Sequence, residues 1–222
     1  MKLRTCIWTF GAIALLGLGG LLCARARGQF SNPESQTTVV HNAKALRPPA
    51  GARVAIVEWE DLECPDCARA NPVLREAAEK YHIPWVRHDF PLPFHHWSFE
   101  AAVDARWFDT QSKAGGKKLG DAFRDAVFAA QPTIHSEDDL RSFAQTFARE
   151  HGLTLPFAVD PQGRVTALVK TDYALGQSVG IRHTPTIWVV TSRTSGTPFV
   201  EVVDRSRLFG MIEDALAETS VR

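Results

Sequence analysis

Two cysteines separated by two residues carry the most informative chemistry in this sequence, in the motif Cys64-Pro65-Asp66-Cys67. A thiolate can attack a disulfide, and a second thiol one helical turn away can resolve the mixed disulfide that results. A helix that begins near Cys64 would direct unpaired backbone N–H groups and the positive end of its dipole at that sulfur. Pro65 suits the first turn of such a helix, where its missing N–H costs nothing. The spacing therefore indicates a redox pair.

Asp66, between the two cysteines, has two opposing effects. An acidic side chain suits the N-terminal turn of a helix, but its negative charge near Cys64 is expected to raise the pKa of that thiol. We therefore expect a less oxidising pair than one with a cation at this position.

Other uses of a C-x-x-C pair fit the sequence less well. A structural zinc site needs about four ligands, usually from a second C-x-x-C or from spaced histidines, and His95 and His96 are adjacent. Covalent haem attachment needs a histidine directly after the second cysteine, where this chain has Ala68. A hydrolase with a cysteine nucleophile would leave Cys67 without a role. A non-enzymatic module that binds a metal or a client protein through the two thiolates remains as the alternative class.

The N-terminal residues, 1–26, differ in kind from the rest of the chain. Lys2 and Arg4 precede an uncharged, largely apolar run from Thr5 to Ala24, and Ala24-Arg25-Ala26 has the small-x-small pattern of a cleavage site. The run approaches the length of about 20 residues that spans a bilayer, so the segment is either a signal peptide or an uncleaved membrane anchor. Both interpretations place the remainder outside the cytoplasm, as a periplasmic or otherwise extracytoplasmic protein.

The cysteine count favours redox chemistry, and the charge balance argues against nucleic-acid binding. The chain has four cysteines, and removal of residues 1–26 would leave only Cys64 and Cys67. Cysteines three positions apart close too small a loop to act as a structural staple, which favours chemistry. The 25 acidic and 25 basic residues balance, so the basic excess of a nucleic-acid-binding protein is absent from the sequence.

The pattern along the chain predicts an α/β protein with a mixed sheet flanked by helices. Residues 27–51 are expected to form a linker, and residues 52–220 a single domain with a helical insertion at about 97–180. A strand from Arg53, a helix that runs from Cys64 to about Tyr81 and a second strand form a β-α-β unit. The later elements are predicted in the order helix, helix, helix, helix, strand, strand, helix: Phe99–Thr110, Lys117–Ala130, Glu137–Glu150, Val165–Val179, Thr186–Thr191, Pro198–Val203 and Arg207–Glu218. The second strand of the β-α-β unit is expected at Pro84–Phe90.

Several segments resemble DsbA-like proteins of the thioredoxin superfamily. Val57 to Cys67 is similar to their active-site stretch, and Pro72 to the proline that kinks the active-site helix. Arg87 to Pro93 resembles the second strand and its exit loop, and Tyr173 to Pro185 the approach to the cis-proline loop. The resemblance implies a thioredoxin-like fold with a helical insertion, and a thiol–disulfide oxidoreductase that needs no metal or organic cofactor. It also implies exported client proteins and a membrane redox partner.

One departure from the family leaves the redox direction open. Asp66 stands where the family often has histidine or tyrosine. A disulfide reductase or isomerase of the same fold is therefore the alternative activity.

The resemblance also suggests roles for individual residues. Thr184 and Pro185 would form the cis-proline loop and offer the Thr184 backbone to an extended client segment, alongside Pro65 and Asp66; a trans proline that opens a strand is the alternative. Glu58, six residues before Cys64, would be a buried acid that relays the proton of Cys67. Its alternative is a solvated acid at a strand end, because burial is expected to fade over Trp59-Glu60-Asp61.

A loop after the second strand contains more polar and aromatic side chains. The active-site face could be bordered by four residues of this loop: His95, His96, Trp97 and Phe99. Isolated loop histidines, however, are usually solvated. The aromatic residues of the helical insertion, such as Trp107, Phe123, Phe143 and Phe147, are expected to be core.

Overall fold

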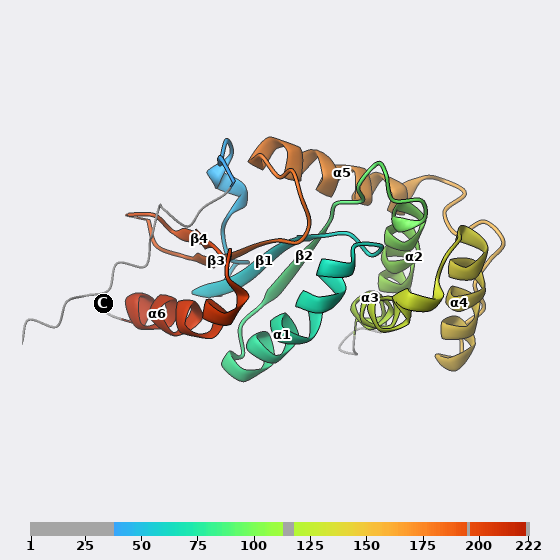
Figure 1. The fold of residues 1–222 in the computed structure, drawn as a ribbon, viewed down its shortest axis with the longest axis horizontal. Coiled ribbons are helices and arrows are strands. Elements are labelled where there is room, and N and C mark those ends of the chain that lie inside the picture. Colours follow the sequence, from blue (N-terminus) through green and yellow to red (C-terminus); the bar gives the residue numbers. More distant parts are fainter. Residues whose placement is uncertain (1–37, 113–117, 195, 221–222) are drawn as a thin grey trace, which may run out of the picture.

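The computed structural model describes residues 38–112, 118–194 and 196–220 (Figure 1). Residues 1–26, predicted as a signal peptide or membrane anchor, lie outside these ranges, as do residues 27–37 of the predicted linker. Within the described ranges, no helix has both the length and the apolar character required to cross a bilayer.

The centre of the fold is a four-stranded sheet with the strand order β2-β1-β3-β4. Its strands are β1 (Val54–Glu60), β2 (Trp85–Asp89), β3 (Thr186–Thr191) and β4 (Phe199–Glu201). β1 pairs with β2 in parallel, whereas the β1–β3 and β3–β4 pairs are antiparallel. Every residue of β1 and β3 is buried, because helices cover both faces of these central strands, and this explains their nearly continuous apolar sequence.

Two sets of helices cover the two faces of the sheet (Figure 1). On one face, α1 (Pro65–Tyr81) and α6 (Leu208–Ser220) pack Leu74 and Ile212 against Ile56 and other apolar strand residues. On the opposite face, α5 (Arg164–Val179) and the short 3₁₀ helix η2 (Ala43–Ala45) bury strand residues that include Trp59 and Trp188. The side chains of each strand alternate between these two cores, as the period of a strand requires.

The helical insertion lies between β2 and β3, beside the sheet (Figure 1). It contains α2 (Ser98–Thr110), α3 (Leu119–Ala130), the 3₁₀ helix η3 (Gln131–Thr133) and α4 (Glu137–Glu150), and α5 leads back to the sheet. A core of packed aromatic rings, with Phe108, Phe123 and Phe147 in mutual contact, holds the insertion together. The predicted fold class is confirmed, and the element boundaries agree with the predictions to within about two residues.

The described part of the segment predicted as a linker packs on the domain. Leu46 is fully buried in the core under α5. The backbone N–H of Thr38 donates to one carboxylate oxygen of Glu201 at 2.9 Å, and its hydroxyl donates to the other at 2.8 Å. These contacts make residues 38–46 part of the folded unit.

Candidate active site

The two cysteines lie where β1 leads into α1. Cys64 is the N-cap residue of α1 and is 7% exposed, whereas Cys67 is fully buried. The two residues are 3.6 Å apart at their closest and both are free thiols. The thiol of Cys64 donates to the carbonyl oxygen of Thr184 at 3.3 Å, and the Thr184–Pro185 peptide bond is cis, as expected. The fold therefore brings the cis-proline loop, 120 residues away in the chain, against the cysteine pair.

The surroundings of the two cysteines move their pKa values in opposite directions. The pKa of Cys64 is lowered to about 5, mainly because the Cys67 thiol hydrogen-bonds to its sulfur, and the backbone N–H groups of Cys67 and Asp66 add to this effect. Burial raises the pKa of Cys67 well above its ordinary value, and the neighbouring Cys64 and Glu58 raise it further. Cys64 is therefore the thiolate of the pair, and Cys67 stays protonated.

Asp66 is paired with two arginine side chains beside the redox pair. Its carboxylate accepts two hydrogen bonds from Arg205, at 2.7 and 3.0 Å, and lies 3.2 Å from Arg69. The hydrogen bond from Arg205 lowers the pKa of Asp66, while the Asp66 backbone N–H stabilises the Cys64 thiolate. A cation distant in sequence therefore compensates the acid, and the rise in the Cys64 pKa expected from Asp66 stays a prediction.

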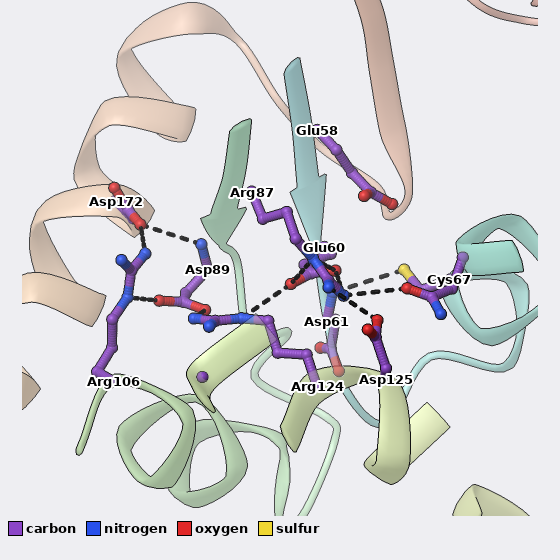
Figure 2. Close-up of polar contacts among 12 residues, drawn as sticks. Glu58, Glu60, Asp61, Cys67, Arg87, Asp89, Arg106, Arg124, Asp125 and Asp172 are labelled. Carbon is purple, nitrogen blue, oxygen red and sulfur yellow. Dashed lines mark hydrogen bonds and ion pairs between the residues drawn. The ribbon is translucent and has the colours of Figure 1, made fainter. Parts of the chain in front are cut away.

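Glu58 lies in the middle of β1 and is 1% exposed, as expected of a buried acid. Burial is the main cause that raises the pKa of Glu58 to about 8, and the nearby charge of Glu60 acts in the same direction. The indole N–H of Trp85 donates to its carboxyl group at 3.0 Å. Figure 2 shows Glu58 on β1 with Cys67 on α1 beyond it, and the charges of these two groups influence each other.

Asp61 and His95 form a contact beside the cysteines that sequence reasoning missed. The backbone N–H of Asp61 donates to Cys67 Sγ at 3.5 Å, while its carboxylate accepts from His95 Nδ1 at 2.8 Å and from the Leu92 N–H at 2.6 Å. His95 is therefore not the solvated loop residue that was expected, whereas His96 is exposed. The loop after β2 is thus tied to the segment that carries the redox pair.

A buried network of charges joins the sheet to the helical insertion (Figure 2). Arg87 of β2 donates three hydrogen bonds to Glu60, and Arg124 of α3 forms ion pairs with Glu60 at 3.1 Å and with Asp89 at 2.8 Å. Arg106 of α2 pairs with Asp89 in turn. The network was not predicted, since its members come from four elements and no spacing in the sequence links them.

No group of three or more histidine, cysteine, aspartate or glutamate side chains suited to a metal ion occurs in the part of the chain that the structure describes. Cys64 and Cys67 belong to a buried apolar cluster that also contains Leu62 and Trp97.

The low pKa of Cys64 predicts a pH dependence of stability that differs between the reduced and oxidised protein. The folded-state pKa, about 5, lies below the ordinary value of 9.0, so ionised Cys64 stabilises the reduced fold fully above pH 9.0. This contribution is lost as the pH falls towards 5. We expect the difference in unfolding free energy between the reduced and oxidised proteins to change with pH across this window, with the reduced form gaining stability as the pH rises, and the ultraviolet absorbance of the thiolate to titrate with a midpoint near pH 5.

Urea unfolding of both redox forms at several pH values measures the first effect, and direct absorbance titration measures the second. Cys64→Ser is the control and should remove the acidic titration. A thiolate that appears only near the ordinary pKa would contradict the assignment.

A thioredoxin fold with a helical insertion, and a C-x-x-C pair that begins α1 beside a cis-proline loop, define a thioredoxin-like thiol–disulfide oxidoreductase. The chain belongs to the thioredoxin family, whose sequence profile matches residues 49–199. The resemblance and the enzyme class predicted from the sequence are both confirmed.

Solved structures of distant relatives share the fold. The alpha-DsbA1 protein from Wolbachia pipientis has a TM-score of 0.63 and 16% identity, over 79% of this chain and 92% of that chain. A thioredoxin-like oxidoreductase from Silicibacter pomeroyi has a TM-score of 0.54 and 23% identity, over 85% and 95% of the two chains. A periplasmic thioredoxin-like protein from Salmonella enterica serovar Typhimurium has a TM-score of 0.55 and 20% identity, over 76% and 87%.

A curated relative is similar in sequence over most of the chain. The Na(+)/H(+) antiporter NhaA 1 of Salinispora arenicola is 27% identical over 178 residues, which are 80% of this chain and 25% of that protein. The chain thus spans about a quarter of the length of that relative.

Proposed function

We propose that the protein exchanges disulfides with exported client proteins outside the cytoplasm, through Cys64 and Cys67. The observation that carries the proposal is the pair itself, 3.6 Å apart, with the pKa of Cys64 lowered to about 5 and that of Cys67 raised. A pair split in this way contains one nucleophile or leaving group and one protonated resolving thiol. The low pKa stabilises the reduced form and so favours transfer of the disulfide to a client.

In the oxidising direction, two electrons pass from a client dithiol to the Cys64–Cys67 disulfide. A client thiolate attacks Cys64 Sγ, the bond between the two cysteines breaks, and Cys67 leaves as a thiolate that takes up a proton. The second client thiolate then attacks the client sulfur of the mixed disulfide. Cys64 leaves as the stable thiolate, and the client gains a disulfide. Cys67 initiates the reverse step, in which it displaces a trapped client from Cys64.

Glu58 is the group proposed to move the proton of Cys67. A carboxyl group with a pKa of about 8 holds a proton near neutral pH and can give it to the Cys67 thiolate. Without that proton, the buried thiolate would be an unpaired charge, which is unfavourable in the interior. The electrostatic influence of Glu58 on Cys67, both deeply buried, supports this role.

Four residues around Cys64 are proposed to hold an extended client segment: Thr184, Pro185, Pro65 and Asp66. The backbone of Thr184 lies directly beside the Cys64 sulfur, so a client that pairs with this backbone would place its own sulfur within reach. The Thr184 side chain is buried and helps to lower the pKa of Cys64, so its backbone, rather than its hydroxyl, is the part proposed to meet a client. Recognition by backbone pairing would accept clients of varied sequence.

The extracytoplasmic location and the redox partner belong to the same proposal. The charged and apolar pattern of residues 1–26 supports export, with either cleavage or retention as an anchor. The structural relative from Salmonella enterica is described as periplasmic. An exported protein that gives its disulfide to clients needs a membrane redox partner to accept its electrons.

The redox equilibrium of the purified protein against glutathione tests the proposal, with Cys64→Ser as the control. We expect a midpoint between about −270 and −120 mV, the thioredoxin and DsbA values, and nearer the oxidising end because the Cys64 thiolate is stabilised. A midpoint at the reducing end would instead indicate a reductase or isomerase, and an isomerase would also dimerise. If the two cysteines form no reversible disulfide, stoichiometric binding of a soft metal becomes the measurement of choice for the alternative module.

A further inference from the structure

Arg205 makes a two-point contact with the acid inside the redox motif. It begins the 3₁₀ helix η4 (Arg205–Arg207), directly before α6, and α6 runs beside α1 in Figure 1. Its two terminal nitrogens lie 2.7 and 3.0 Å from the two carboxylate oxygens of Asp66, 139 residues away in the chain. This bidentate geometry is specific to an arginine–carboxylate pair and fixes both groups.

The position of Asp66 gives this contact a consequence for the cysteines. Asp66 is the second residue of the helix that Cys64 caps, and its backbone N–H is one of the donors that stabilise the Cys64 thiolate. An unpaired carboxylate at this point would oppose a negative charge on that sulfur. Arg205 is also within electrostatic reach of Cys67 and Glu58, since both groups raise its pKa, after the larger effect of Asp66.

Other charged groups around Asp66 do not replace Arg205. Arg69, on the same helix as Asp66, makes one contact at 3.2 Å and its side chain is 67% exposed, so solvent screens it more strongly. The Arg205 side chain is 34% exposed and reaches the acid from a different element. Glu58 faces the cysteines from β1 and is mostly protonated near neutral pH, since its pKa is about 8.

We propose that Arg205 is a positioning residue of the redox site: by pairing with Asp66 it offsets the negative charge of that acid, and so stabilises the Cys64 thiolate and the reduced protein. The proposal rests on the exchange function proposed above and would explain how a motif with an acid between its cysteines holds the oxidising disulfide that this function needs. Without Arg205, the uncompensated acid should favour the disulfide form.

The test compares Arg205→Ala with the wild type in two measurements, the thiolate titration of Cys64 and the redox equilibrium with glutathione. We expect the Cys64 midpoint to rise and the equilibrium to shift by about 2- to 5-fold towards the protein disulfide, the size expected of a half-exposed ion pair. Arg205→Lys should recover part of the shift, since lysine restores the charge without the two-point geometry. Arg207→Ala is the matched control, because Arg207 is exposed in the same turn and should leave both values unchanged.

A double-mutant cycle with Asp66→Asn separates this role from a purely structural one. In the Asp66→Asn background, Arg205→Ala should have little effect on either measurement. An equal shift in both backgrounds would overturn the proposal, as would an equal loss of stability in the reduced and oxidised forms. A different result would contradict the proposed exchange function, namely a wild type that forms no reversible disulfide. In that case the titration of Cys64 would still test the role of Arg205.

Discussion

Replacement of Cys64 by serine is expected to reduce disulfide exchange by more than about 1,000-fold, because the attacking or leaving thiolate is lost and serine does not ionise near neutral pH. Cys67→Ser should lose turnover as well, but through a different step. The variant keeps the Cys64 nucleophile, so it should accumulate mixed disulfides that no second thiol resolves. Oxidation of a reduced peptide with two cysteines measures turnover, and non-reducing electrophoresis with mass spectrometry measures the trapped complex.

The comparison of the two variants tests whether both cysteines are needed. It also tests which cysteine forms the mixed disulfide with the client and which one resolves it. Cys64 is 7% exposed and beside Thr184, whereas Cys67 is fully buried, so only Cys64 is placed to meet a client sulfur. Mixed disulfides that form in Cys64→Ser and are absent from Cys67→Ser would reverse this assignment. Wild-type levels of exchange by either variant would contradict the enzyme function.

The parts of this molecule that are encoded locally could be predicted from the sequence. The redox pair, its helix and the flanking strands depend on adjacent residues and on short periodic patterns, and Thr186–Thr191 has the predicted bounds. Helix ends were predictable where a side chain fixes them, as with Ser136, which accepts from the backbone N–H of Asp139 at the start of α4. Family resemblance contributed the cis bond before Pro185, which no local pattern indicates.

Contacts between distant polar residues could not be predicted, and they change the interpretation of β1. The sequence predicts that burial fades over Trp59-Glu60-Asp61, yet Glu60 and Asp61 are each only 1% exposed. Each acid can be buried because a basic side chain distant in sequence pairs with it: Arg87 with Glu60, and His95 with Asp61. A charge normally marks a solvated position, unless such a partner compensates it, and one sequence does not show which charges are compensated.

The buried charge network leads to the second large effect, on stability. Arg124 is 1% exposed, and it contacts Glu60 and Asp89 on the two neighbouring strands that end beside the insertion. Arg124→Met would leave both acids short of a partner in the interior, so we expect a loss of about 3–5 kcal/mol in unfolding free energy. Urea unfolding at neutral pH measures this loss. Arg69→Met, which removes an exposed arginine with one carboxylate contact, should cost only about 0–1 kcal/mol.

The pH dependence of this loss distinguishes an unpaired charge from a simple packing defect. Although burial favours its protonated form, the charges of Arg124 and Arg106 lower the pKa of Asp89 below its ordinary value. Ionised Asp89 therefore stabilises the wild type above that ordinary value, and the contribution is lost as the pH falls through the lowered one. The difference between wild type and Arg124→Met should be full at neutral pH and shrink in acid, and Asp89→Asn should recover part of it in the variant. A deficit that is constant with pH would mean that Arg124 acts through packing alone, and a deficit no larger than that of Arg69→Met would mean that its buried ion pairs add little to stability. A deficit that shrinks in acid would show that the ion pair between Arg124 and Asp89 stabilises the contact between the insertion and the sheet.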